Sequence, residues 1–356
     1  MSQINLLDLV CENVKNLRAY HVETVESGVM LHANENPYPP SPELLNKILT
    51  RLEKLELNRY PDPDCKALKE AISNRTGVSA NQLVVGNGSD ELIQSLLQVF
   101  CKEGDTVALP NPTFAMYEIM GKGMGLNIQT FPLNDQWDFE AEPIIEKLNE
   151  SNARIVFISY PNNPTGNCFS RKAIQKLIEN FPGIVVLDEA YHDFSGQTFL
   201  DQMEKHNNLV ILRSLSKIGL AGLRVGYGIF PSIIAGEIDK VRLPYNSNSI
   251  SQLAATELLN NFEQVQKQIE SIKKERIRLF DELTKLPSVT AFPSDANFIL
   301  FQASDKGEKV FKYLMGHRIL IRNLGAHPML KNCLRVTIGT DDENNQFLDR
   351  LAQAVQ

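Results

Sequence analysis

The chain has 356 residues, of which 43% are hydrophobic and 22% are charged, and its 36 Lys and Arg against 43 Asp and Glu give a formal net charge of −7. The length favours two globular domains, and an acidic balance without a long basic run argues against nucleic acid or a membrane surface as a partner. The first apolar run contains Asp8 and Glu12, which excludes a secretory signal, and no stretch reaches the ~18 apolar residues of a membrane span.

The five cysteines are scattered along the chain, and none of them belongs to a Cys-x-x-Cys pair. This spacing argues against a disulfide framework and against a zinc site, so we expect no metal. Free thiols fit a reducing compartment, and we predict a cytoplasmic protein. The cysteines are Cys11, Cys65, Cys101, Cys168 and Cys333.

Residues 1–42 are predicted to form an N-terminal arm that packs with the smaller of two domains. A short helix is expected over residues 5–17. Four prolines between Pro37 and Pro42 then fix an extended path. The polar residues from Asn34 to Asn36, just before these prolines, fit either a plain linker or a loop that faces a ligand.

Residues 43–246 alternate between apolar strands and amphipathic helices, and they are predicted to form the large domain. The predicted strands are 83–86, 106–109, 126–131, 154–159, 183–187 and 209–212. The predicted helices are 43–55, 65–76, 89–100, one that opens at 111–114, and 170–180. The glycine-rich residues 121–125 are predicted to be a loop. Near-continuous apolar strands that alternate with helices predict an α/β fold with a mostly parallel central sheet flanked by helices.

Residues 247–356 have a different pattern, which predicts a smaller α+β domain. After a break at 244–248, helical periodicity runs from 249 to 286. Further strands are predicted at 289–292, 297–301, 319–322 and 334–338, with a helix at 306–317. Thr340 and Glu343 have the capping-box spacing that begins a last helix.

Polar residues follow the carboxyl ends of several predicted strands, namely residues 87–90, Asn163, Asp188 and Lys217. Ligands of open α/β sheets bind at these ends, so we expect one shared site. The turn at 87–90 leads into a helix N-terminus, where backbone N–H groups suit an anion. Asp188 follows an apolar strand, and a carboxylate is costly to bury there unless it is paired.

Lys217 lies just past the strand at 209–212, among apolar residues and the hydroxyls of Ser214 and Ser216. Burial disfavours the ammonium form, so the amine can be neutral and can form a Schiff base with an aldehyde. The two hydroxyls and the guanidinium of Arg224 suit a phosphate. An aldehyde that carries a phosphate describes pyridoxal 5′-phosphate. Most lysines are solvated surface charges, so the hypothesis depends on the other motifs of the chain.

Four motifs supply that support: Gly-Asn-Gly-Ser-Asp-Glu from Gly86, Asn-Asn-Pro-Thr-Gly from Asn162, Asp-Glu-Ala-Tyr from Asp188 and Ser-Leu-Ser-Lys from Ser214. Through them the chain resembles, over nearly its whole length, the fold-type I pyridoxal-phosphate aminotransferases. Within that family it is most similar to the histidinol-phosphate aminotransferases. The resemblance implies a large domain with a mostly parallel sheet, a smaller α+β domain and a cytoplasmic homodimer.

The resemblance also implies roles for individual residues. Lys217 would hold pyridoxal phosphate covalently and then move a proton, and Asp188 would pair with the ring nitrogen of the cofactor. Tyr191, the third catalytic residue, would contact the 3′-oxygen of the ring. The other implied cofactor contacts are Gly88, Ser89, Asp90, Phe114, Asn163, Ser214, Ser216, Arg224 and, from the partner subunit, Tyr60.

For the substrate, the resemblance implies that Arg335 binds the anionic end, with Arg322, Asn34 and Tyr20 as further candidates. The implied reaction interconverts L-histidinol phosphate and 2-oxoglutarate with 3-(imidazol-4-yl)-2-oxopropyl phosphate and L-glutamate, in histidine biosynthesis. The seven-residue spacing from Lys217 to Arg224 is one shorter than in many relatives, so a different turn must present this arginine.

Several alternatives stay open at this point. An aromatic amino-acid aminotransferase or a threonine-phosphate decarboxylase would share the same motifs. A ligand-sensing domain of a transcription regulator would need a DNA-binding module, and no basic helix-turn-helix segment is recognisable. A nicotinamide-dependent dehydrogenase would need a third glycine after Gly86 and Gly88 in the spacing of the dinucleotide fingerprint.

Overall fold

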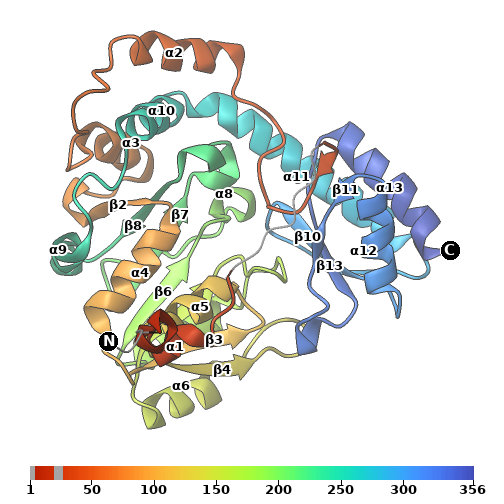
Figure 1. Ribbon diagram of the computed structural model, residues 1–356, viewed down its shortest axis with the longest axis horizontal. Coiled ribbons are helices and arrows are strands. Elements are labelled where there is room, and N and C mark those ends of the chain that lie inside the picture. The colour runs from red at the N-terminus through yellow and green to blue at the C-terminus, as the bar shows by residue number, and fades with distance from the viewer. Residues whose placement is uncertain (1–4, 20–26) are drawn as a thin grey trace.

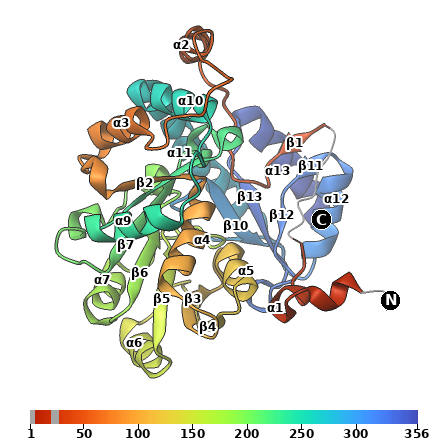
Figure 2. The ribbon, with the colours of Figure 1, turned by 60° about the vertical axis from the view of Figure 1, so that its left-hand side comes forward.

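The structure is a computed structural model that describes residues 5–19 and 27–356. A large sheet with helices on both faces lies beside a smaller sheet with its own helices (Figures 1 and 2). The large sheet has the strand order β2 (Leu83–Asn87), β8 (Val225–Ile229), β7 (Leu209–Ser214), β6 (Ile184–Asp188), β5 (Ala153–Ser159), β3 (Thr106–Asn111) and β4 (Asn127–Pro132).

The prediction of a mostly parallel central sheet is confirmed. The strands β4, β3, β5, β6 and β7 pair in parallel, and among the described strands of this sheet only β8 runs antiparallel to its neighbours, β2 and β7. The sequence did not predict β8 as a separate strand. A Cβ built on Gly226 would lie 2.3 Å from the backbone nitrogen of Ser89, so a glycine here lets β8 pack directly against the turn after β2.

The core of this part divides into two apolar layers, because successive side chains of a strand point to opposite faces. Val186 and Val210 pack on one face with α4 and α9, whereas Val185, Leu187 and Ile211 pack on the other face with α6 and α7. Both layers are fully enclosed, which explains the near-continuous apolar strands. The helices of this part are α2 (Pro42–Leu52), α3 (Lys66–Thr76), α4 (Ser89–Phe100), α5 (Ala115–Gly123), α6 (Ala141–Glu150), α7 (Arg171–Asn180), α8 (His192–Ser195), α9 (Ser232–Val241) and α10 (Ser249–Asn260).

Two predictions near α5 were wrong. The helix expected to open at 111–114 begins at Ala115, because Asn111 still pairs with Pro132 in the sheet and Phe114 keeps an extended backbone. The expected loop at 121–125 is largely the end of the same helix. A Cβ on Gly121 would lie 2.7 Å from the side chain of Ile128, so this glycine serves close packing of helix on strand.

The smaller sheet has the order β12 (Arg322–Asn323), β13 (Cys333–Thr337), β10 (Phe298–Gln302) and β9 (Thr290–Ala291). It is accompanied by α11 (Phe262–Thr284), α12 (Gly307–Gly316) and α13 (Asp341–Val355), which lie together in Figure 1. The capping box of Thr340 and Glu343 at the start of α13 is confirmed. The strand β1 (Val29–Met30) pairs in parallel with β11 (Ile319–Leu320), which ties the N-terminal segment to this part of the chain.

The helix expected over residues 5–17 is interrupted. A 3-10 turn, η1 (Leu6–Leu9), and a short α1 (Glu12–Lys15) flank an extended backbone at Val10 and Cys11. In the parts of the chain that the structure describes, no helix has the length and apolar character to cross a membrane.

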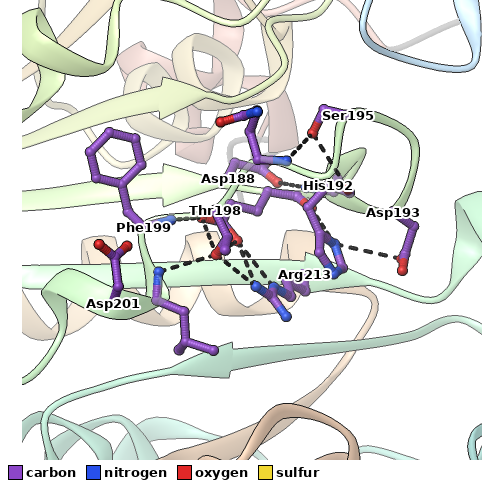
Figure 3. A network of polar contacts seen from close by, with 12 residues as sticks. Asp188, His192, Asp193, Ser195, Thr198, Phe199, Asp201 and Arg213 are labelled. Atoms are coloured by element: carbon purple, nitrogen blue, oxygen red, sulfur yellow. Dashed lines mark hydrogen bonds and ion pairs between the residues drawn. The ribbon is translucent and has the colours of Figure 1, made fainter.

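A buried ion pair anchors the end of β6, immediately after Asp188. The carboxylate of Glu189, which is 0% exposed, accepts hydrogen bonds from Arg213 Nε and Nη2 at 3.1 and 2.9 Å. It also accepts from the hydroxyl of Thr198 and from the backbone N–H of Phe199. Figure 3 shows Arg213, Thr198 and Phe199 close together within this network of polar contacts. Because these contacts converge from two other segments on one buried carboxylate, they fix the backbone that carries Asp188.

We expect Arg213→Ala to lower the free energy of unfolding by about 3–5 kcal/mol, because the charge of Glu189 would stay buried without its cation. Lys240→Ala is the matched control, since Lys240 and Glu237 form an exposed pair, and we expect a loss of at most ~1 kcal/mol there. Urea unfolding followed by circular dichroism measures both values. Equal small losses in the two variants would contradict a stabilising role for the buried pair.

Candidate active site

A cavity of about 280 Å³ lies at the carboxyl ends of β5, β6 and β7, and side chains of β12 and β13 form its opposite wall. Most of the site residues predicted from the sequence line it. They are Asn34, Ser89, Asp90, Phe114, Asn163, Asp188, Tyr191, Ser214, Ser216, Lys217, Arg224, Arg322 and Arg335. Of the remaining candidates, Gly88 adjoins the cavity wall, Tyr60 lies elsewhere on the surface, and Tyr20 lies outside the described residues.

Lys217 is held in the cavity by a one-turn segment, η4 (Ser216–Ile218), that follows β7. Its Nζ donates a hydrogen bond to the backbone carbonyl of Ala33 at 3.3 Å. Burial, together with the positive charges of Arg335 and Arg224, lowers the pKa of the Lys217 amine to about 8, while the charges of Asp90 and Glu35 oppose this shift. About a tenth of this amine is therefore neutral at pH 7, far more than for an exposed lysine, and the neutral form is the nucleophile towards an aldehyde.

Asp188 ends β6 and is almost fully buried. Burial raises the pKa of its carboxyl group to about 6, while hydrogen bonds from the Tyr117 hydroxyl and the Ala190 backbone N–H oppose that rise. These donors lie 2.7 Å from Oδ2 and 3.1 Å from Oδ1. The carboxylate is thus mainly ionised at neutral pH and can keep a ring nitrogen protonated.

The end of the cavity at α4 has the features of a phosphate site. Gly88, with φ +78°, turns the chain from β2 into the N-terminus of α4. The Arg224 guanidinium donates from Nη1 to Ser216 Oγ and from Nη2 to Asp90 Oδ2, both at 3.2 Å. The positive φ of Gly88 favours glycine, and a Cβ there would also lie 2.5 Å from Arg224 Nη2. The backbone N–H of Ser89, at the start of α4, completes a cradle that suits an anion.

The short spacing from Lys217 to Arg224 is resolved by a specific turn. The 3-10 segment η5 (Ala221–Leu223) precedes Arg224, which adopts a left-handed backbone with φ +53°. This conformation brings the guanidinium back to Ser216 and Asp90 within the seven residues available.

The hydroxyl of Tyr191 forms the centre of a second set of contacts. It accepts hydrogen bonds from Asn34 Nδ2 at 3.0 Å and from Asn163 Nδ2 at 3.3 Å. Two donors on one oxygen leave the phenolic hydrogen to point at an acceptor in the cavity. Burial raises the pKa of Tyr191, so the hydroxyl keeps this hydrogen at neutral pH.

The wall opposite Asp188 carries two arginines that are paired across the small sheet. Arg335 in β13 lies opposite Arg322 in β12. Arg335 Nη1 donates to Asn163 Oδ1 at 2.5 Å, and its Nη2 donates to the backbone carbonyl of His32 at 2.8 Å. Two guanidinium groups on one wall suit an anionic group of a substrate, either carboxylate or phosphate.

Several residues that line the cavity were not predicted from the sequence. Thr113, Ser159 and Leu324 line the cavity, and the buried Tyr117 contacts Asp188 from behind it. Tyr117 lies three residues after Phe114, the spacing at which helical neighbours share a face, and this spacing was the available signal. Tyr60 is 81% exposed and stacks on Tyr245 with ring centroids 4.4 Å apart.

Comparison with known proteins shows which family the chain is similar to. The sequence profile of the family described as aminotransferase class I and II matches residues 26–351. The chain is 40% identical to histidinol-phosphate aminotransferase 2 of Nitrosococcus oceani, over 99% of this chain and 98% of that one. It is also 40% identical to the histidinol-phosphate aminotransferase of Aquifex aeolicus, with 98% of both chains covered.

Among solved structures, the fold is similar to that of the histidinol-phosphate aminotransferase of Sinorhizobium meliloti in complex with pyridoxal-5′-phosphate. The TM-score is 0.89 at 23% sequence identity, and the match covers 97% of both chains. The full-length sequence similarity and the shared fold lead to one conclusion, which the motifs had predicted. The chain belongs to the aminotransferase class I and II family and, within it, to the histidinol-phosphate aminotransferases.

Proposed function

We propose that the protein is a pyridoxal-phosphate-dependent transaminase that interconverts L-histidinol phosphate and 2-oxoglutarate with 3-(imidazol-4-yl)-2-oxopropyl phosphate and L-glutamate, in histidine biosynthesis. The observation that carries the proposal is one cavity that holds a buried amine, a buried carboxylate, an anion cradle and two arginines. Relatives of full length that carry the name of this activity support it. The S. meliloti relative was solved with the proposed cofactor.

We propose the following arrangement for the cofactor. Lys217 Nζ would hold the aldehyde, Asp188 would pair with the ring nitrogen, and Tyr191 with Asn163 would donate to the ring oxygen. Gly88, Ser89, Asp90, Ser214, Ser216 and Arg224 would hold the phosphate. Phe114, which lines the cavity, would pack against the ring.

When bound, pyridoxal phosphate supplies an electron sink for the negative charge that develops at the substrate α-carbon. Asp188 stabilises that charge indirectly by keeping the ring nitrogen protonated. Lys217 would hold the cofactor through its aldehyde, and its neutral amine would move a proton from the substrate α-carbon. The low pKa of its amine allows it to act as a base near neutral pH.

The anionic end of each substrate is proposed to bind Arg335, with Arg322, Asn34 and Tyr20 as further contacts. One half-reaction brings a carboxylate to this wall and the other brings a phosphate ester. A guanidinium accepts both anions in a bidentate manner, which suits a pocket that must serve two substrates in turn.

We further propose a cytoplasmic homodimer in which Tyr60 reaches the phosphate of the neighbouring site. Large apolar side chains near Tyr60 are exposed in the single chain, including Leu57, Leu243 and Tyr245. A second copy would cover them. We also propose that the chain divides into an arm at 1–42, a cofactor domain at 43–246 and a small domain at 247–356, in line with the separate sheets, with α10 of the last segment packing back on α2 and α3 of the cofactor domain.

The activity is tested by half-reactions followed in the visible spectrum. L-Histidinol phosphate should convert the bound cofactor to its amine form, and 2-oxoglutarate should restore it. Phenylalanine and threonine phosphate are the comparison substrates. Faster conversion by phenylalanine would indicate an aromatic aminotransferase, and carbon dioxide release from threonine phosphate would indicate a decarboxylase.

Lys217→Ala should abolish turnover and the visible absorption that borohydride reduction removes, while the fold is retained. In the cofactor-free wild type, the rate at which added pyridoxal phosphate becomes covalently attached should rise about tenfold per pH unit and level off above about pH 8, because the neutral amine is the nucleophile. Lys240→Ala, far from the cavity on α9, is the control. Turnover by Lys217→Ala at the wild-type rate would refute the assigned role.

Tyr60→Ala should weaken cofactor binding at least about tenfold through loss of a hydrogen bond to a charged group. A mixed dimer of Tyr60→Ala and Lys217→Ala chains should regain one working site, with Lys217 from one chain and Tyr60 from the other. A wild-type chain paired with a chain that carries both Tyr60→Ala and Lys217→Ala should not regain such a site. In that dimer, neither site combines Lys217 of one chain with Tyr60 of the other. Absence of recovery in the first mixture would place Tyr60 in the site of its own chain.

A further inference from the structure

A buried tyrosine hydroxyl contacts the carboxylate of Asp188 from the side away from the cavity. The side chain of Tyr117 is 0% exposed, and its hydroxyl donates a hydrogen bond to Asp188 Oδ2 at 2.7 Å. Tyr117 comes from α5 and does not line the cavity, whereas Phe114, the residue immediately before this helix, does. The start of α5 therefore contributes to the site directly through Phe114, which precedes the helix, and indirectly through Tyr117.

Packing fixes the position of this hydroxyl. The Tyr117 ring stacks on Phe157 of β5, with ring centroids 4.9 Å apart and planes at 11°. Phe114 packs against its edge at 5.4 Å and 85°. A ring enclosed in this way cannot follow a displaced partner, so the hydroxyl is a fixed point to which the Asp188 carboxylate must conform.

The second contact of the carboxylate comes from its own chain. The Ala190 backbone N–H donates to Oδ1 at 3.1 Å. With one fixed donor on each oxygen, the plane of the carboxylate is determined. A carboxylate has about four lone-pair positions, so both oxygens retain the capacity to accept from a ring N–H in the cavity.

The Tyr117 hydroxyl opposes the groups that raise the pKa of Asp188. Burial, with the negative charge of Asp90, raises the pKa of the carboxyl group to about 6, while Tyr117, Ala190 N–H and Lys217 act to lower it. Burial and the charge of Asp188 raise the pKa of Tyr117 well above 10, so Tyr117 stays protonated and remains a donor at every working pH. Without this hydroxyl, protonated Asp188 would be more populated at neutral pH.

We propose that Tyr117 is a positioning residue for Asp188, whose hydroxyl fixes the carboxylate in the orientation and charge state that the ring nitrogen of the cofactor requires. The inference rests on the proposed function, because that nitrogen is what gives an ionised Asp188 its use. The competing interpretation is that Tyr117 is only a core aromatic residue. The two differ in what loss of the hydroxyl alone would change.

Tyr117→Phe removes the hydroxyl and keeps the ring. Tyr160→Phe is the matched control, because Tyr160 is also buried but its hydroxyl interacts with Cys168. In cofactor-free protein, infrared difference spectroscopy follows the carboxyl band of Asp188 through a pH titration, and Asp188→Asn identifies that band. The same proteins, loaded with pyridoxal phosphate, give kcat and KM as functions of pH.

The titration midpoint of Asp188 should rise by about one pH unit in Tyr117→Phe, since the lost hydrogen bond favours the charged form. In loaded enzyme, kcat should fall roughly tenfold to a hundredfold, as expected for a hydrogen bond to a charged group, with KM nearly unchanged. The acid limb of the kcat profile should move to higher pH. Tyr160→Phe should leave the midpoint and kcat at wild-type values.

A second variant keeps the proposal testable if Tyr117→Phe fails to fold. Incorporation of 3-fluorotyrosine at position 117 makes the phenol a stronger donor and should move the Asp188 midpoint to lower pH. An unchanged Asp188 midpoint in both variants would overturn the proposal. A fall in kcat that comes with a lower Tm but with no shift of the midpoint would overturn it as well. Failure of wild-type protein to bind pyridoxal phosphate would instead refute the proposed function, because the infrared titration needs no cofactor.

Discussion

Burial of two groups of opposite charge in one cavity is the constraint on which the site depends. Enclosure lowers the pKa of the Lys217 amine to about 8 and raises the pKa of the Asp188 carboxyl to about 6. The same physical cause therefore brings both groups close to neutral pH, from opposite directions. A sheet with helices on both faces provides this enclosure, because the helices cover its strands on both sides.

Enclosure of this kind has a cost, and the structure offsets it locally. A buried charge is tolerated when hydrogen bonds satisfy it. Glu189 is satisfied by Arg213 and by the segment at Thr198, and Asp188 by Tyr117 and a backbone N–H. The two adjacent carboxylates at the end of β6 thus have different roles. Glu189, just after the strand, forms an ion pair and holds the backbone, whereas Asp188 remains accessible to the cavity.

Much of the site could be predicted because its residues stand at the ends of apolar strands, where polar groups are conspicuous. Asp188 and Lys217 are of this kind. Tyr117 was not predicted, because its partner is 71 residues away and its spacing from Phe114, the available signal, fits an ordinary core aromatic residue equally well. The start of α5 and the antiparallel direction of β8 also escaped prediction. Both depend on pairing and close packing between strands that are distant in sequence, at Asn111 and Gly226.

Hydrogen bonds connect the arginine wall to the residues proposed to hold the cofactor. Arg335 donates to Asn163, Asn163 donates to Tyr191, and Tyr191 also accepts from Asn34. The backbone N–H of Asn34 in turn donates to Thr337, which lies on the same strand as Arg335. The loop that contains Asn34 therefore belongs to a closed ring of contacts between the two sheets. An anion that draws Arg335 away from Asn163 would remove one restraint on Tyr191, so substrate binding at one wall is coupled to the hydroxyl at the other.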